Sequence, residues 1–159
     1  VESDLIYLVP ELVHVDSAAF ARQAAELRIR DTSGPETEAL LRSYGGQFAP
    51  EFEYEDWAIG WREQVHATFL DLSEQAARRR LPGQANQAAT ILRHALDVDP
   101  TALELKGLLA AAMHFSGSQA AARILYEQYA TEWEREFGES PPKLQEFLAS
   151  VRSARPTSQ

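Results

Sequence analysis

The sequence predicts an all-α protein, a right-handed tetratricopeptide-like stack of about seven helices with a short β remnant at its N-terminus. Two observations predict the stack. Gly83 and Gly117 lie 34 residues apart, and 34 residues is the period of the tetratricopeptide helix-turn-helix unit. Residues around the two glycines keep the same register: Ala76 pairs with Ala110, Leu81 with Phe115, Ala88 with Ala122, Ile91 with Leu125 and Leu92 with Tyr126. One unit cannot bury its apolar face alone, so units stack and present a curved surface to a partner.

The N-terminal stretch differs from the rest of the chain. Residues 5–15 are rich in β-branched and apolar types, and Pro10 interrupts them. Such a run favours two short strands or part of a hairpin. A hairpin is marginally stable by itself, so we interpret residues 1–15 as the remnant of an upstream domain or linker.

The first helix is expected over residues 17–30, because Asp16 and Ser17 are favourable N-cap residues. A second helix follows over residues 36–43. Pro35 suits its first position, and the Tyr44-Gly45-Gly46 sequence ends it. These two helices resemble a degenerate first pair of the stack.

The third helix is expected to begin with Asp56 as its cap and to run to about Arg80. Its apolar residues recur every three or four positions, as in an amphipathic helix: Trp57, Ile59 or Trp61, Val65, Phe69, Leu72 and Ala76. The fourth helix is expected over residues 84–97, ending before Pro100. Its inward residues are predicted to be Ala88, Ile91, Leu92 and Ala95.

The second repeat is expected to form helices over residues 101–115 and 118–137, the latter ended by Gly138. Tyr129 and Glu134 stand where this repeat should have a small residue and a proline. It is therefore looser than the first, as a terminal repeat often is. A last short helix extends to about residue 152, and residues 153–159 are predicted to be a disordered tail.

Composition limits the class of protein. The chain has 159 residues and no cysteine, which excludes disulfide scaffolds, thiolate metal sites and cysteine nucleophiles. No secretory signal sequence or membrane-spanning apolar run is present, so we expect a cytoplasmic location. Because the first residue is valine, we also expect the chain to be a processed protein or a piece of a longer one.

The charge disfavours direct binding to nucleic acid. The net charge is −9, and the only dense basic run is Arg78-Arg79-Arg80. We interpret that run as the solvated C-terminus of a helix, where cations offset the helix dipole. Binding of phosphates requires clustered Lys and Arg, so the chain alone is not expected to bind DNA.

No motif indicates an enzyme, a cofactor or a metal. The four histidines, at positions 14, 66, 94 and 114, contain no pair at i, i+4 spacing. Carboxylates between residues 51 and 56 lack the pattern of a calcium loop, and we attribute them to helix capping. No glycine lies in a phosphate-binding motif.

Large aromatic side chains are the candidates for contact with a protein partner. Trp57 and Tyr126 occupy predicted apolar faces and are assigned to the core. Trp61, Tyr129 and Trp133 are expected to be more exposed, and they are the predicted interaction residues.

With these elements placed, the chain resembles the bacterial transcriptional activator domain of SARP-type regulators. The resemblance covers roughly residues 12–150 and depends on several short motifs in the right order. They are Val15-Asp16 with Phe20 and Ala24-Ala25, Tyr44-x-Gly46-x-Phe48-x-Pro50, Asp56-Trp57 with Arg62, Asp99-Pro100 with Glu104, Gly117 with Ala121, Ala122 and Tyr126, and Glu136-Phe137-Gly138-x-x-Pro141. We assign the domain to residues 16–152 and expect Arg62 to pair with a carboxylate near the loop of residues 44–50.

The resemblance implies a regulatory protein-interaction domain whose DNA-binding winged-helix domain lies upstream and is absent from this chain. It suggests RNA polymerase or a second copy of the domain as a partner, with DNA contacted only through the upstream domain. No membrane, metal or cofactor is expected. The alternative is a tetratricopeptide-like scaffold domain of a multidomain signalling ATPase or sensor protein.

Overall fold

The regular structure consists of α-helices. The computed structural model describes residues 16–46 and 56–154, and the elements in these two ranges are seven helices. They are α1 (Asp16–Arg30), α2 (Pro35–Ser43), α3 (Asp56–Arg80), α4 (Ala85–Val98), α5 (Leu103–Phe115), α6 (Gln119–Phe137) and α7 (Leu144–Ser153). The predicted all-α class is confirmed, with helix bounds that differ by a few residues. Helix α7 includes Ser153, which the sequence assigned to the tail.

Some sequence predictions fall outside the described residues. These are the β remnant at residues 1–15, the loop containing Phe48, and the tail at residues 155–159. The structure gives the backbone of Asp56 and Trp57 in the first turn of α3 but does not describe their side chains. The capping role of Asp56 and the core role of Trp57 therefore stay predictions.

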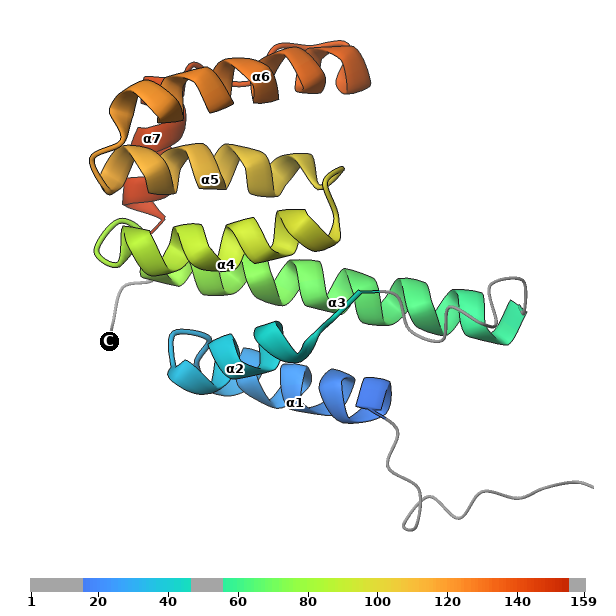
Figure 1. Cartoon of the computed structure of the whole chain (residues 1–159). Helices are drawn as coiled ribbons and strands as arrows, with labels where there is room; N and C mark the ends of the chain where they lie inside the picture. The colour runs from blue at the N-terminus through green and yellow to red at the C-terminus, as the bar shows by residue number, and fades with distance from the viewer. Residues whose placement is uncertain (1–15, 47–55, 155–159) are drawn as a thin grey trace, which may run out of the picture.

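The helices form a stack of hairpins (Figure 1). Helices α3 and α4 form one pair, and α5 and α6 form the next; α4 contacts α5 between them. The α1–α2 pair packs on α3 at one end of the stack. At the other end α7 crosses behind α5 (Figure 1) and contacts it. This arrangement is the predicted tetratricopeptide-like stack.

The 34-residue register is visible in the burial of equivalent residues. Ala76 and Ala110 are fully buried, as are Ala88 and Ala122. Small side chains at these positions let neighbouring helices approach closely. Two equivalent pairs differ, because Leu81 and Ile91 are buried whereas Phe115 and Leu125 are only partly buried. The second unit is thus the looser one.

The predicted turn glycines lie at helix ends. Gly117 joins α5 to α6 with a φ of 96°, and Gly138 caps the C-terminus of α6 with a φ of 73°. Both angles belong to the left-handed region that favours glycine. Gly83 lies in the turn between α3 and α4, and Gly46 follows α2 with a φ of 116°.

The two repeats end differently. Helix α4 has 14 residues and stops at Val98, two residues before Pro100. Helix α6 has 19 residues and continues past Glu134, the residue equivalent to Pro100, as far as Phe137. Glutamate permits a helix to continue where proline ends one. Because Glu134 stands where the first repeat has Pro100, α6 extends past the point equivalent to the end of α4.

One large apolar core joins the first pair to the repeats. It contains buried residues from α1 through α5 and from α7. Phe69 of α3 is fully buried and contacts the rings of Phe20, Tyr44 and His94. A smaller cluster of Ala110, Tyr126 and Tyr129 lies between α5 and α6.

Candidate functional site

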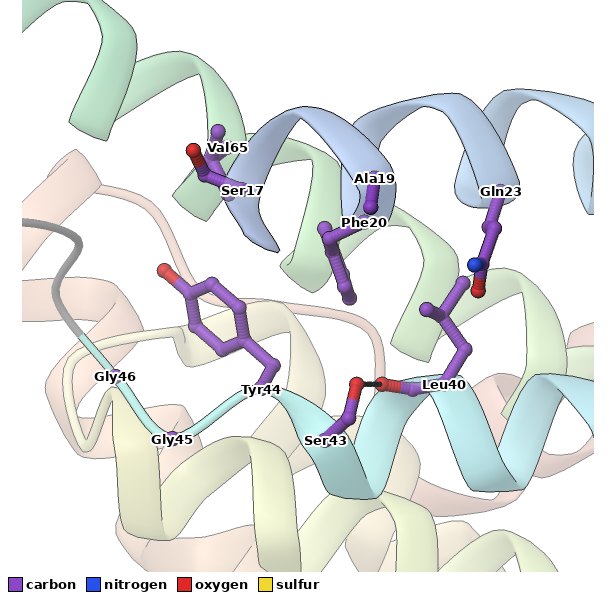
Figure 2. Close-up of a pocket in the computed structure, with 10 residues that line it drawn as sticks. All are labelled: Ser17, Ala19, Phe20, Gln23, Leu40, Ser43, Tyr44, Gly45, Gly46 and Val65. Carbon is purple, nitrogen blue, oxygen red and sulfur yellow. Dashed lines mark hydrogen bonds between the residues drawn. The ribbon is translucent and has the colours of Figure 1, made fainter. Parts of the chain in front are cut away.

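A pocket of about 360 Å³ lies between α1, α2 and α3 (Figure 2). Phe20, Leu40 and Val65 make much of its wall apolar. The hydroxyls in the wall are engaged in internal hydrogen bonds: Ser17 accepts one from Trp61 Nε1 at 2.9 Å, and Ser43 donates one to the Leu40 carbonyl at 2.7 Å. Neither serine hydroxyl in the wall of this pocket is paired with a histidine or a carboxylate in these hydrogen bonds.

Tyr44 forms one side of the pocket and follows directly from the end of α2. Its backbone leaves the helix in an extended conformation while its N–H donates to the Leu41 carbonyl at 3.2 Å. The side chain is consequently turned into the core, where the ring stacks on Phe69 at 4.3 Å between centroids. Burial raises the pKa of the Tyr44 hydroxyl, so this group stays protonated at neutral pH.

A hydrogen-bonded chain connects Tyr44 to the end of α4. The Tyr44 hydroxyl is 3.3 Å from His66 Nδ1, and His66 Nε2 is 2.9 Å from Asp99 Oδ2. Asp99 also accepts hydrogen bonds from the backbone and hydroxyl of Thr101. Burial raises the pKa of Asp99, but the hydrogen bonds from Thr101 and His66 outweigh it, so the pKa lies below its ordinary value.

The Tyr44–His66–Asp99 chain resembles a catalytic triad only in its order of groups. A nucleophile needs a lowered pKa or a base that can take its proton, whereas the tyrosine is buried and its pKa is raised. The chain instead connects the end of α2 to α3 and to the C-cap of α4.

The interpretation of the basic run as a solvated helix end is wrong for Arg80. Its side chain is fully buried, and its guanidinium donates to four backbone carbonyls: Thr32 at 2.8 Å, Ala76 at 3.0 Å, Ser33 at 2.8 Å and Gly34 at 3.2 Å. It also pairs with Glu38 at 3.2 Å. Arg80 thus binds the turn between α1 and α2 to the end of α3.

The two other arginines of the run are also engaged. Arg78 Nε lies 2.8 Å from Glu74, and Arg79 lies 3.6 Å from Asp31 of the α1–α2 turn. Each cation therefore has an acidic partner within the fold. The run does not form the cluster of uncompensated cations that phosphate binding needs.

Of the predicted interaction residues, Tyr129 does not meet the expectation of exposure. Its side chain is only 4% exposed. The physical reason is Gly107 of α5: a Cβ there would lie 3.2 Å from Tyr129 Cζ, so the absence of a side chain makes room for the ring. Trp61 is partly buried and hydrogen-bonded to Ser17, which connects α3 to α1.

Trp133 forms an aromatic pair at the end of α6 with Phe137, which lies in one of the family motifs of the sequence but was not among the predicted interaction residues. The rings of Trp133 and Phe137 lie 4.4 Å apart, and Phe137 is 51% exposed. The extension of α6 to Phe137 could have been predicted from the sequence, because Glu134 stands where the first repeat has a proline. Tyr126, assigned to the core, is buried, and its hydroxyl donates to the Pro142 carbonyl at 2.6 Å. Interaction roles for Trp61 and Trp133 stay predictions.

Arg62 lies in the wall of a second pocket, of about 280 Å³, together with Gly46, Glu63, His66 and Asp99. The predicted pairing of Arg62 with a carboxylate near the loop of residues 44–50 remains a prediction, since residues 47–50 of that loop lie outside the described ranges.

The described residues are also consistent with neither a metal site nor a membrane-spanning helix. Residues 16–46 and 56–154 contain no group of three side chains arranged to bind a metal ion. No helix in this part of the chain is both long enough and apolar enough to cross a membrane.

Comparison with known proteins gives one match. The family model of the bacterial transcriptional activator domain matches residues 15–152, a range that contains α1 to α6 and all of α7 except Ser153. No curated protein and no solved structure matches the chain significantly.

Proposed function

This chain belongs to the bacterial transcriptional activator domain family, and we propose that it is the regulatory protein-interaction part of a bacterial transcription regulator. In this proposal a winged-helix domain upstream in the polypeptide binds DNA. The present chain contacts a protein, either RNA polymerase or a second copy of itself. The family is a transcription-regulator domain and not an enzyme family.

The family match over residues 15–152 is the observation that carries the proposal. The fold supports it, because stacked helical hairpins create extended surfaces suited to binding proteins. The arginine run also supports the proposal that another domain binds DNA, because Arg78, Arg79 and Arg80 each pair with an acidic side chain within the fold. DNA contact is therefore assigned to the upstream domain.

A tethering experiment tests the proposal. The whole chain is fused to a heterologous DNA-binding domain, and a bacterial reporter carries the matching operator upstream of a weak promoter. We expect reporter output to rise above that of the DNA-binding domain alone. A fusion with Leu92→Asp, which places a charge in the fully buried core, is the unfolded control.

A folded fusion that leaves the reporter unchanged would contradict the proposal. The alternative function, a scaffold domain of a multidomain signalling ATPase or sensor protein, would then be favoured. Circular dichroism of the purified fusion establishes that the domain is folded, so that misfolding and lack of activation are not confused.

A further inference from the structure

The extension of α6 leaves an open pocket beside the beginning of α5. This pocket has a volume of about 560 Å³. Pro100, Leu103 and Glu104 form the α5 side, and Glu132, Glu136 and Phe137 are among the residues on the α6 side. Apart from Pro100, which ends the first repeat, the residues named here belong to the last repeat, in which the sequence departs from the tetratricopeptide pattern.

Aromatic rings extend along α6 toward this pocket, from Tyr126 through Tyr129 and Trp133 to Phe137. The two tyrosines are buried and contact Phe147 of α7. Phe137 makes a ring contact with Trp133 alone among the described residues, and half of its surface is exposed. The row therefore begins in the core and ends as an apolar surface that α7 does not cover.

The same end of α6 carries an excess of negative charge. Residues 132–139 contain four glutamates and one arginine, Arg135. Glu132 pairs with Lys106 of α5, whereas neither Glu104 nor Glu136 has an ion pair in the described part of the chain. Glu104 lies near enough to Tyr129 to contribute, after burial, to raising the pKa of its hydroxyl. The pocket thus combines the exposed Phe137 ring with three glutamates and two cations, Lys106 and Arg135, so that acidic groups are in excess by one.

Two carboxylates at the end of α6, Glu134 and Glu136, occupy a position that helix electrostatics disfavour. The C-terminus of a helix carries a partial negative charge, so cations stabilise it and anions do not. Helices α1 and α3 follow this rule, since arginines occupy their last turns. Helix α6 has Glu134 and Glu136 in its last turn beside a single arginine. Glu134 accepts a hydrogen bond from Ser140 at 3.3 Å, so the rule is broken without a structural gain at Glu136, and such a break is typical of a functional surface.

We propose that the pocket between the start of α5 and the end of α6 is a docking site for a basic peptide segment of a partner protein. An arginine or lysine side chain lies against Phe137, whose ring is backed by Trp133, and its cationic group faces Glu104 and Glu136. This inference rests on the proposed function in that the partner is a protein, and it adds the chemistry by which that partner is recognised.

The chemistry fits a long basic side chain in two ways. Its methylene stem packs on apolar surface while its charged end stays near solvent and carboxylates. Its cation is attracted to an aromatic face, by about 0.5–1 kcal/mol at an exposed site. The negative end of the α6 dipole adds to the attraction. An acidic peptide would meet repulsion from the same groups.

Binding is measured by NMR on the whole ¹⁵N-labelled chain. The probes are a dodecapeptide of alternating arginine and leucine and its counterpart with glutamate in place of arginine. The indole N–H of Trp133 reports on the pocket, and that of Trp61, which is bonded to Ser17 of α1, is the internal reference. We expect the arginine peptide to shift the Trp133 resonance saturably and Trp61 to stay unchanged.

Matched variants localise the site. Phe137→Ala, and Glu104→Gln combined with Glu136→Gln, are each expected to weaken binding about five-fold or more, the equivalent of about 1 kcal/mol. Ile124→Ala and Glu127→Gln are controls on exposed positions of the same helix, and Ile124 is 57% exposed. Thirteen residues are about 3.6 turns, so Ile124 and Phe137 lie on different sides of α6.

The proposal is overturned if both peptides shift Trp133 equally, if neither does, or if the pocket variants bind as tightly as the controls. If the peptide experiment fails in one of these ways but the tethered reporter is active, the docking site is wrong and the proposed function stands. If the reporter is silent but the arginine peptide binds and the pocket variants weaken that binding, the docking site stands and the proposed function is wrong.

Discussion

At the scale of single residues, Arg80 has the most consequential environment. Its guanidinium donates to the carbonyl of the buried Thr32, which would otherwise lack this donor, and to those of Ser33 and Gly34 in the α1–α2 turn. Leaving a buried polar group unpaired costs about 1–3 kcal/mol. Among the described residues, three buried polar atoms near this turn have no hydrogen-bond partner: Arg80 Nε and the hydroxyls of Thr32 and Thr37. The contact between the α1–α2 turn and α3 therefore depends on the hydrogen bonds that the Arg80 guanidinium does make.

We expect Arg80→Ala to lower the free energy of unfolding by about 3 kcal/mol or more, because it removes one partner of a buried ion pair and several charge-assisted hydrogen bonds. Arg79→Ala is the matched control, since Arg79 is exposed and forms one long ion pair. Its effect should stay within about 0.5 kcal/mol. Urea denaturation measures both, and similar midpoints for the two variants would contradict the role of Arg80.

Asp99 makes stability depend on pH. Its pKa is lower in the folded chain than the value of about 3.9 expected when unfolded. The carboxylate therefore contributes stability above that unfolded pKa and loses it as the pH falls through the folded pKa. Asp99→Asn should lower the free energy of unfolding by about 2 kcal/mol at pH 7, and by much less near pH 2. A pH-independent difference from the parent chain would contradict this assignment.

At the scale of elements, glycines decide how closely helices approach and how they turn. Gly107 brings the Tyr129 ring against the α5 backbone. Gly117 has a different role, since a Cβ there would meet nothing within 4 Å but its φ of 96° disfavours any side chain. The first glycine is required by packing and the second by backbone conformation.

Gly117→Val should lower the free energy of unfolding by about 1–2 kcal/mol, the cost of left-handed backbone for a residue with a Cβ. Gly60→Ala is the contrasting control. Gly60 lies inside α3, and a Cβ there would meet nothing within 4 Å. Alanine should stabilise that helix by up to about 1 kcal/mol. Thermal denaturation measures both variants, and an unchanged melting temperature for Gly117→Val would count against the repeat register.

The elements were predictable because their signs are local. Periodicity located α3 and α4, and turn residues such as Gly117 and Gly138 located helix ends. The environments of Arg80 and Tyr129 were not predictable in this way. Each depends on a residue distant in sequence, the α1–α2 turn for Arg80 and Gly107 for Tyr129, and neither dependence leaves a periodic pattern. Phe137 is exposed because α6 continues past Glu134, which stands where the first repeat has Pro100. This difference is visible only when the two repeats are aligned.

At the scale of the whole molecule, electrostatics separate this chain from a DNA-binding protein. The net charge is −9, and the single basic run is neutralised by partners inside the fold. Association with DNA depends on release of counterions by uncompensated cations. The molecule should instead repel DNA and attract basic segments of proteins.

We expect the isolated chain to cause no shift of duplex DNA in a gel at about 150 mM salt and micromolar protein, since its negative field opposes approach of the phosphates. Electrophoresis at about 50 mM salt, where electrostatic binding is strongest, is the stringent comparison. A shift that weakens steeply with added salt would show an uncompensated cationic surface and overturn the argument from charge.

The position of Arg80 limits how this domain can change in length during evolution. Stacked repeats are approximated by units that contact only their neighbours, so duplication or deletion of a unit is often tolerated. Here α3 holds a buried cation whose partners lie in α1–α2. Deletion of that first pair would strip Arg80 of all but the Ala76 carbonyl, whereas units added beyond α7 would leave it intact. Loss of the first pair should therefore destabilise the remaining helices in a way that an addition beyond α7, which removes no partner of Arg80, would not.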